Sequence, residues 1–294
     1  MRIAAVIVTF NRKALAIECL KGMLGQSRMP DHVFIIDNAS TDDTPEVLSA
    51  TGILGREDVT YFRTETNLGG AGGFHQGMKL AYEAGYDWIW IMDDDVEPLP
   101  SALERMLGFA DISRCIQPGR MYAHGERVDW DQTFDPSTGI KSFHKDTRLK
   151  YRPWKEVDVG CFEGMLIARE IVDRIGLPDP RFFLVHDDSI YGFAASLHTP
   201  VIYLRDSLML KKLRPNTLSP RFCFYAARNH FLVMEQLTAL GAADRRGRLI
   251  VGACFLLSTL LAKSLVRGGL KPAIAVMRGI LAGWQGKFGR SAFY

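Results

Sequence analysis

The chain has 294 residues, of which 47% are hydrophobic and 23% are charged, and its formal net charge is +3. This composition supports a packed core in one large domain or two smaller ones, and it excludes disordered and collagen-like chains. The charge is unevenly distributed, because residues 241–294 hold nine Lys or Arg side chains and one acid, giving +8 there and −5 elsewhere. The asymmetry indicates an anionic partner surface, either a membrane or a nucleic acid.

The first hundred residues alternate between strand-like and helix-like segments. Apolar runs predict strands at Ile3–Phe10, Val33–Ile36, Val59–Phe62 and Trp88–Met92. Helical spacing and turn residues predict helices over 14–24, Thr44–Ala50, the segment after the Gly-rich stretch Asn67–Gly73, and Ser101–Ala110. This alternation favours an α/β fold with a mostly parallel central sheet and flanking helices.

The cysteines and the N-terminal stretch indicate the cellular compartment of the protein. The five cysteines are scattered and form no C-x-x-C pair, which argues against a disulfide framework or a zinc site and is typical of a reducing cytoplasm. The apolar N-terminal stretch is interrupted by Asn11–Lys13, and no small-residue cleavage site follows it. We therefore interpret it as a buried strand rather than a signal peptide.

Acidic residues follow three of the predicted strands. They are Asp37, the run Asp93–Asp95, and the pair Asp187 and Asp188. Ligands of open parallel sheets bind at the carboxyl ends of the strands, so we expect these acids to meet at one edge.

The run of three aspartates carries the strongest chemical signal. Three carboxylates at the end of an apolar strand repel one another, and a divalent cation such as Mg2+ or Mn2+ would relieve the repulsion. The alternative is a solvated acidic turn before the helix at Ser101–Ala110.

Two further motifs each allow a functional and a structural interpretation. The Gly-rich stretch Asn67–Gly73 either brings backbone N–H groups to a phosphate or is a closely packed connection, and it matches neither a P-loop nor a dinucleotide-binding fingerprint. One carboxylate of Asp187 and Asp188 either accepts a proton from an acceptor hydroxyl or caps a helix that starts near Ser189.

Together these motifs resemble those of a known family. The set comprises Val8–Arg12, Asp37–Asp42, Asn67–Gly73, Met92–Asp95, Glu163–Ile167, Gly176–Leu184 and His186–Ser189. It resembles the inverting glycosyltransferases of family 2, which have a GT-A fold. The Gly-rich stretch and the triple aspartate are most similar to those of bacterial galactofuranosyltransferases, and next to polysaccharide rhamnosyltransferases. The resemblance covers residues 3–290, including Phe224–Asn229 and Arg278–Gly289.

The resemblance implies an organisation and a set of site residues. Residues 1–220 would form a Rossmann-like GT-A catalytic domain, and residues 221–294 a helical, basic C-terminal region. The nucleotide would contact Thr9, Phe10, Arg12, Asp37, Asn67, Asp93 and Asp94. Mn2+ or Mg2+ would be bound by Asp95 with Asp94, and Asp188 or Asp187 would be the general base. Weaker candidates for contact with the acceptor or the diphosphate are Glu163, Trp154, His186 and Lys211.

One departure from the family pattern concerns the metal. The family usually supplies a histidine ligand downstream of the catalytic acid, and the stretch Val201–Lys212 contains none. Lys211 or Lys212 could take that position, or His198 could approach from nearby. A lysine there could neutralise the diphosphate directly and weaken the metal requirement.

The implied activity is transfer of a sugar, specifically galactofuranose from UDP-galactofuranose, to a glycan or lipid-linked oligosaccharide acceptor. The setting would be the synthesis of a cell-surface polysaccharide such as O-antigen. The alternatives are rhamnosyl transfer from dTDP-rhamnose, a nucleotidyltransferase that makes the sugar nucleotide, and a non-catalytic protein that binds a sugar nucleotide.

The least regular segment is Arg114–Tyr151. Its long connection contains or adjoins five aromatic residues, Trp130, Phe134, Phe143, Tyr151 and Trp154. Such a connection is a binding loop or lid whose rings stack on sugar faces, or an ordinary excursion such as a β-hairpin.

The C-terminal region contains an uncharged stretch of 14 residues, Leu249–Ala262, flanked by basic residues. A membrane span needs about 20 residues, so the stretch is too short to cross a bilayer. It favours a helix in the interface of an anionic membrane, at the inner face of the cytoplasmic membrane. The alternative is a buried helix that covers the catalytic domain or forms a subunit contact. The apolar stretch and the family resemblance favour a membrane over nucleic acid.

Overall fold

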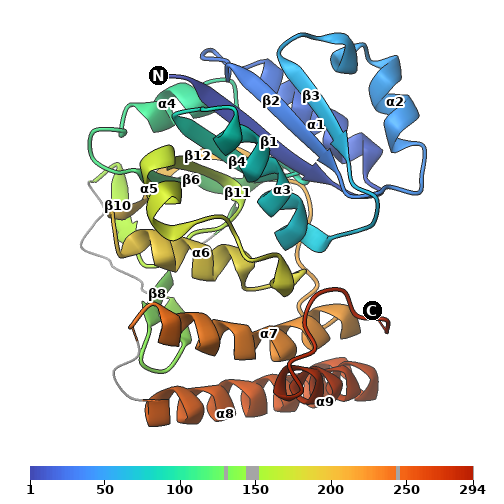
Figure 1. Cartoon of the computed structure of the whole chain (residues 1–294), viewed down its shortest axis with the longest axis vertical. Coiled ribbons are helices and arrows are strands. Elements are labelled where there is room, and N and C mark those ends of the chain that lie inside the picture. Colours follow the sequence, from blue (N-terminus) through green and yellow to red (C-terminus); the bar gives the residue numbers. More distant parts are fainter. Residues whose placement is uncertain (129–131, 144–151, 243–245, 294) are drawn as a thin grey trace.

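A mixed sheet of ten strands forms the centre of the computed structural model, which describes residues 1–128, 132–143, 152–242 and 246–293 (Figure 1). Eight of the strands lie in the order β10-β12-β6-β11-β4-β1-β2-β3, with β5 paired to β12 and β7 paired to β6. Their bounds are β1 Ile3–Thr9, β2 His32–Asp37, β3 Val59–Arg63, β4 Trp88–Asp93, β5 Val96–Pro98, β6 Cys115–Tyr122, β7 Arg127–Val128, β10 Trp154–Val157, β11 Glu163–Ala168 and β12 Val201–Lys211.

Helices cover both faces of this sheet and continue into a C-terminal layer. Those of the sheet domain are α1 Lys13–Leu24, α2 Thr44–Ala50, α3 Gly69–Glu83, α4 Ala102–Leu107, α5 Arg169–Ile175 and α6 Asp187–Ser196, with 3-10 turns at Ile53–Gly55 and Pro180–Phe182. The C-terminal layer consists of α7 Pro220–Ala239, α8 Arg246–Lys263, a π-helical turn at Ser264–Gly268, and α9 Leu270–Trp284.

The expected α/β fold is confirmed, and its parallel part is the N-terminal half. Strands β3, β2, β1 and β4 are all parallel neighbours. The second half is mixed, because β11 runs antiparallel to both β4 and β6, and β10 runs antiparallel to β12. The sheet is therefore less uniformly parallel than the alternation of strands and helices predicts.

Alternation along β1 shows how the sheet is buried on both faces. Ile3, Ala5 and Ile7 belong to a core cluster with residues of α1 and α4, whereas Ala4, Val6 and Val8 belong to a cluster with residues of α3, α5 and α6. Successive side chains of a strand point to opposite faces, so an entirely apolar strand needs both layers.

The Gly-rich stretch packs closely against β1 at its helical end, while Gly69 and Gly70 line a cavity. Helix α3 begins at Gly69, so most of the stretch is the first turn of a helix rather than a loop. A Cβ atom on Gly73 would lie 2.5 Å from the side chain of Val8, and one on Gly77 would lie 2.3 Å from Val6. These glycines let α3 approach β1 more closely than any larger residue permits.

The irregular segment contains a β-hairpin. Strands β8 Gln132–Asp135 and β9 Ile140–Phe143 pair antiparallel and lie next to α6 and α7 (Figure 1). The hairpin alternative is therefore correct for this part of the segment. Trp130 and Tyr151 lie outside the described residues.

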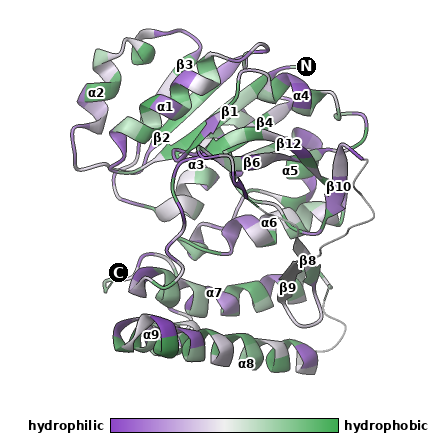
Figure 2. Ribbon diagram, turned by 180° about the vertical axis from the view of Figure 1, so that it is seen from behind, coloured by the Kyte–Doolittle hydropathy of each residue, from purple (hydrophilic) through white to green (hydrophobic). Residues whose placement is uncertain are grey.

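Helices α7, α8 and α9 pack together below the sheet domain, and much of α8 and α9 is hydrophobic (Figure 2). The stretch Gly247–Gly268 forms 22 continuous helical residues, and an 18-residue window within it has a mean hydropathy of 2.1 and is 22% buried. By length and composition alone it could cross a membrane. The exclusion of a span by length is therefore wrong, because the helix continues beyond the 14 uncharged residues.

Candidate functional site

A cavity of about 580 Å³ opens at the carboxyl ends of β1 and β4. Of the predicted site residues, it is lined by Thr9, Phe10, Arg12, Asn67, Asp93, Asp94, Asp95 and Lys211. Of the three acidic segments expected to meet at one edge, the triple aspartate lines this cavity, whereas Asp37 and the pair Asp187 and Asp188 are not among its lining residues. We call this space the donor cavity.

Asp94 is held by two residues that follow β1. Thr9 Oγ1 donates to Asp94 Oδ2 at 2.8 Å, and the Arg12 guanidinium donates to Asp94 Oδ1 at 3.0 Å. Burial raises the pKa of Asp94, whereas Arg12 and Thr9 favour its charged form. Both carboxylate oxygens of Asp94 are thus engaged, and Asp94 does not belong to the carboxylate cluster of its neighbours.

The carboxylate cluster consists of Asp93, Asp95 and Glu163, each with an oxygen within 4.8 Å of the others. Glu163 begins β11, whose antiparallel register against β4 pairs Glu163 with Met92 and so brings its carboxylate beside the aspartates. Burial and the neighbouring Asp95 raise the pKa of Asp93 well above its usual range.

Lys211 lies on this cluster. Its Nζ donates to Asp95 Oδ1 at 2.8 Å and to Glu163 Oε1 at 2.7 Å, and Arg120 forms a second ion pair with Glu163. Lys211 ends β12 and is buried, whereas the next residue, Lys212, pairs with Glu18 and Glu97 outside the cavity. The alternation of a strand end therefore selects Lys211 from the two candidate lysines. His198 is exposed after α6 and does not join the cluster.

The cluster matches the chemistry of a hard divalent cation. All its donors are carboxylate oxygens, the ligands that Mg2+ and Mn2+ prefer, and they converge within a few ångströms. Asp95 and Glu163 also bind the Lys211 ammonium, so a cation at this site competes with Lys211 for the same oxygens.

Two of the predicted site residues, Asp37 and Trp154, do not line the donor cavity. Asp37 is fully buried, where its carboxylate accepts hydrogen bonds from the Ser40 N–H and the Tyr61 hydroxyl, while the neighbouring Asn38 lines the donor cavity. Asp37 therefore supports the wall of the cavity from behind. Trp154 begins the edge strand β10 and packs against the hydrophobic core, apart from the residues that line the cavity.

The predicted acid pair begins α6, beside a segment that joins two cavities. Leu184 and Val185 line the donor cavity, and His186 and Ser189 line a second cavity. Asp188 is half-buried, and its Oδ1 accepts hydrogen bonds from the Ser189 N–H at 2.6 Å and from the Ser189 hydroxyl at 3.1 Å.

Asp187 faces a different environment. It lines a third, smaller cavity with Tyr191 and Gln236, and it is buried. Burial, together with the Asp188 charge, raises the pKa of Asp187 to about 8. Of the pair, Asp188 is the more exposed carboxylate.

Backbone strain before α6 is held by two residues of α7. Phe183, Val185 and His186 all have positive φ angles, which are rare for residues other than glycine. Asn229 donates from Nδ2 to the carbonyls of Phe182, Leu184 and Val185. The buried Arg228 guanidinium donates to the carbonyls of Arg181 and Phe182.

Sequence reasoning missed four residues of the site. Arg228 and Asn229 were noted only as part of a family-like block, although adjacent polar residues within an apolar helical stretch are a signal in their own right. Arg214 and Arg221 line the donor cavity from the connection between β12 and α7. They are basic residues that follow the end of a strand, and this pattern could have identified them as site residues.

The environment of Asp187 predicts a specific dependence of stability on pH. A carboxyl with a raised pKa in the folded state holds its proton after the unfolded chain has lost it, so its contribution to stability falls as pH rises from about 4 to about 8. Asp187→Asn removes this loss. As pH rises over this range, the unfolding free energy of the native chain should therefore fall by a few kcal/mol more than that of the variant, the order expected from such a pKa shift.

Chemical denaturation between pH 4 and pH 9 measures this difference, with the exposed Asp111→Asn as the matched control. A difference between Asp187→Asn and the native chain that stays constant over this range contradicts the account.

Comparisons with known proteins agree with this geometry. The galactofuranosyltransferase GlfT1 of Mycolicibacterium smegmatis is 29% identical over 195 residues, which cover 63% of this chain and 62% of that protein. GlfT1 of Mycobacterium tuberculosis H37Rv is 31% identical over 193 residues, covering 63% and 61%. The matched region thus spans about three fifths of the length of these curated relatives.

Solved glycosyltransferases share the fold. S. aureus TarS 1-349 in complex with UDP superimposes with a TM-score of 0.60 at 15% identity, covering 91% of this chain and 74% of that one. The mannosyltransferase PcManGT of Pyrobaculum calidifontis, in complex with GDP-Man and Mn2+, gives 0.57 at 16% identity, covering 97% and 88%. Residues 4–176 match the family described as Glycosyl transferase family 2. The chain therefore belongs to glycosyltransferase family 2.

Proposed function

We propose that this protein transfers galactofuranose from UDP-galactofuranose to a hydroxyl of a glycan acceptor in the synthesis of a cell-surface polysaccharide, with inversion at the anomeric carbon. The observation that carries the proposal is the donor cavity, where a carboxylate cluster and several cations meet at the ends of β1, β4 and β12. The likeness to the GlfT1 proteins supports galactofuranose as the sugar.

The residues of the donor cavity suit the parts of a sugar nucleotide. Thr9, Phe10 and Asn67 lie where the nucleoside would bind, at the carboxyl end of β1 and the start of α3. Arg12 and Arg221 bring positive charge to the same cavity, which favours a diphosphate. A nucleotide site at the ends of parallel strands agrees with the general rule for such sheets.

We propose Asp95, Asp93 and Glu163 as the residues that hold Mn2+ or Mg2+, with Lys211 beside them. When bound, the cation would offset the negative charge that builds on the departing diphosphate. Asp94 was also expected to be a ligand, but its bonds to Thr9 and Arg12 favour a role in positioning Arg12.

Asp188 is the proposed general base. It accepts the proton of the acceptor hydroxyl as the hydroxyl oxygen forms a bond to the anomeric carbon. The bond between that carbon and the diphosphate oxygen breaks on the opposite face, and UDP leaves with the bonding electrons. Attack and departure on opposite faces invert the anomeric centre, and no covalent intermediate with the protein is needed.

Three other functions remain to be tested against this one. A rhamnosyltransferase would use dTDP-rhamnose, a nucleotidyltransferase would release pyrophosphate, and a non-catalytic binding protein would release nothing. The family assignment favours transfer.

The first prediction concerns the reaction. Incubation with UDP-galactofuranose and a lipid-linked glycan acceptor should release UDP, whereas UDP-galactopyranose and dTDP-rhamnose should give much slower turnover.

Asp188→Asn should lower kcat by about 100-fold or more, the usual contribution of a general base, while UDP still binds. Asp187→Asn should lower kcat far less, because its side chain faces another cavity. Faster turnover of dTDP-rhamnose would identify the alternative donor, and equal losses in both variants would refute the assignment of Asp188.

The second prediction concerns the cation. Excess EDTA should abolish UDP release, and added Mn2+ or Mg2+ should restore it, because the carboxylate cluster would otherwise repel the diphosphate. The rate of UDP release, measured before and after metal is restored, tests this. Full turnover in excess EDTA would sink the proposal and would leave Lys211 and the arginines to neutralise the diphosphate.

The third prediction concerns the membrane. We propose that α8 and α9 lie on the anionic inner surface of the cytoplasmic membrane, because both expose large apolar side chains next to basic ones. Val251 is 69% exposed, Phe255 58% and Trp284 76%. Basic residues on the same region include Arg248, Lys263 and Lys271.

Sedimentation with phosphatidylglycerol vesicles measures this association. Removal of residues 241–294 would also uncover Phe224 and Tyr225, which form a core cluster with Ala275 and Val276, so point substitutions are the better test. The double variant Val251→Asp and Phe255→Asp should weaken binding by about tenfold or more. Ile112→Asp, at an exposed apolar site on the sheet domain, is the matched control. Undiminished binding of the double variant would refute the membrane surface.

A further inference from the structure

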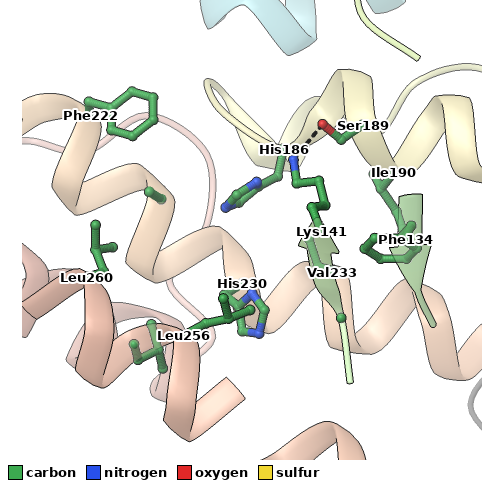
Figure 3. A pocket seen from close by; sticks show the side chains of 13 residues that line it. Phe134, Lys141, His186, Ser189, Ile190, Phe222, His230, Val233, Leu256 and Leu260 are labelled. Atoms are coloured by element: carbon green, nitrogen blue, oxygen red, sulfur yellow. Dashed lines mark hydrogen bonds between the residues drawn. The ribbon is translucent and has the colours of Figure 1, made fainter. Parts of the chain in front are cut away.

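A second cavity, of about 240 Å³, lies between the hairpin β8–β9 and helices α6, α7 and α8 (Figure 3). It shares Phe222 with the donor cavity, so the two are neighbours. Its walls are mostly apolar and include Phe134, Ile190, Val233, Leu256, Leu257 and Leu260. An apolar cavity with a few convergent polar groups is the usual form of a small-molecule site.

The polar groups of this cavity are a lysine, two histidines and a serine. Lys141, on β9, points into the cavity, and its Nζ donates to Ser189 Oγ at 2.7 Å (Figure 3). The described residues give this ammonium a hydroxyl as its hydrogen-bond partner, while the charges of Asp188 and Asp187 act on it without a direct ion pair. A buried cation with no direct anionic partner among these residues can still bind an anion.

His230 is a second polar group that can still form a hydrogen bond. It is 5% exposed, and its Nε2 has no hydrogen-bond partner among the described residues. Burial and the neighbouring Lys141 lower the pKa of His230 to about 4, so the ring is neutral and Nε2 can carry a proton to donate. The ring of His186 lies 6.5 Å away, measured between centroids.

Helix α8 links the cavity to the exposed apolar surface. Leu256, Leu257 and Leu260 face the cavity, whereas Val251 and Phe255 on the same helix are exposed. A hydrocarbon chain bound in the cavity would therefore contact the same helix that exposes apolar side chains outside it.

We propose that this cavity binds the phosphate head and the first hydrocarbon units of a long-chain phosphate, the lipid end of a lipid-linked acceptor. The phosphate lies at Lys141 and His230, and the chain lies against α7 and α8. The inference rests on the proposed function, because it assigns the cavity to the acceptor of that reaction. The link from Lys141 through Ser189 to Asp188 places the phosphate of the acceptor close to the proposed base.

Binding of simple probes tests the cavity without any sugar transfer. Dodecyl phosphate, used below its micelle concentration, should bind the full-length protein more tightly than dodecanol or glycerol phosphate, because only it has both the charge and the chain. Lys141→Met should weaken dodecyl phosphate binding by about tenfold or more, the usual effect of losing a charge-assisted hydrogen bond, and should leave dodecanol binding unchanged. Lys79→Met, on the surface of α3, is the matched control.

A second variant tests the cavity independently of whether Lys141→Met folds. Leu260 is partly exposed on α8, so Leu260→Trp should be tolerated while its larger ring fills part of the cavity. It should weaken the binding of both dodecyl phosphate and dodecanol. Equal binding of dodecyl phosphate to the native protein and to both variants would overturn the proposal, as would glycerol phosphate binding as tightly as dodecyl phosphate.

Transfer assays separate this inference from the proposed function. The same glycan acceptor is prepared with a dodecyl phosphate group and with a methyl group. Lys141→Met should raise KM for the first acceptor only, whereas an equal loss of kcat with both would make Lys141 a support for Asp188 and overturn the lipid site. Absence of transfer with either acceptor would refute the proposed function, while the probe-binding experiment would still decide whether the cavity binds a long-chain phosphate.

Discussion

Repulsion among buried carboxylates at the end of β4 is the constraint on which this site depends. Four acids, namely Asp93, Asp94, Asp95 and Glu163, meet three cations, Arg12, Lys211 and Arg120, within the described part of the chain. Each cation comes from a different strand or its end, so the charge balance requires β1, β6 and β12 to converge on β4 and β11. The mixed half of the sheet brings these groups together, since β11 carries Glu163 and β12 ends at Lys211. The strand topology therefore creates an acidic edge whose charges need cations to balance them.

The proposed base, Asp188, is supported by a different part of the chain. Asp188 follows a strained segment whose carbonyls are held by Arg228 and Asn229 of α7. The C-terminal layer thus supports the segment that precedes the proposed base. It also presents an apolar surface and one wall of the second cavity, so a single set of helices would connect the membrane, the acceptor and the base.

The amino-acid sequence predicted the parts of the fold that local patterns encode. Continuous apolar runs such as Ile3–Thr9 identify buried strands, and acids at their ends identify the edge where ligands bind. The mixed half of the sheet could not be predicted, because strand direction depends on long-range pairing. The same limit hid the second cavity, whose Lys141, His186 and His230 come from three distant segments. Spacing alone also left Lys211 and Lys212 equivalent, and only their opposite directions at the end of β12 separate them.

The central claim is that the carboxylates bound by Lys211 are those that would hold the divalent cation. Calorimetric titration of Mn2+ into the native protein, Lys211→Met and the matched control Lys212→Met tests it most directly. Loss of the competing ammonium should raise the Mn2+ affinity of Lys211→Met by about tenfold, while Lys212→Met should bind as the native protein does, because Lys212 pairs with Glu18 and Glu97 instead. An unchanged or lower Mn2+ affinity in Lys211→Met would contradict the account.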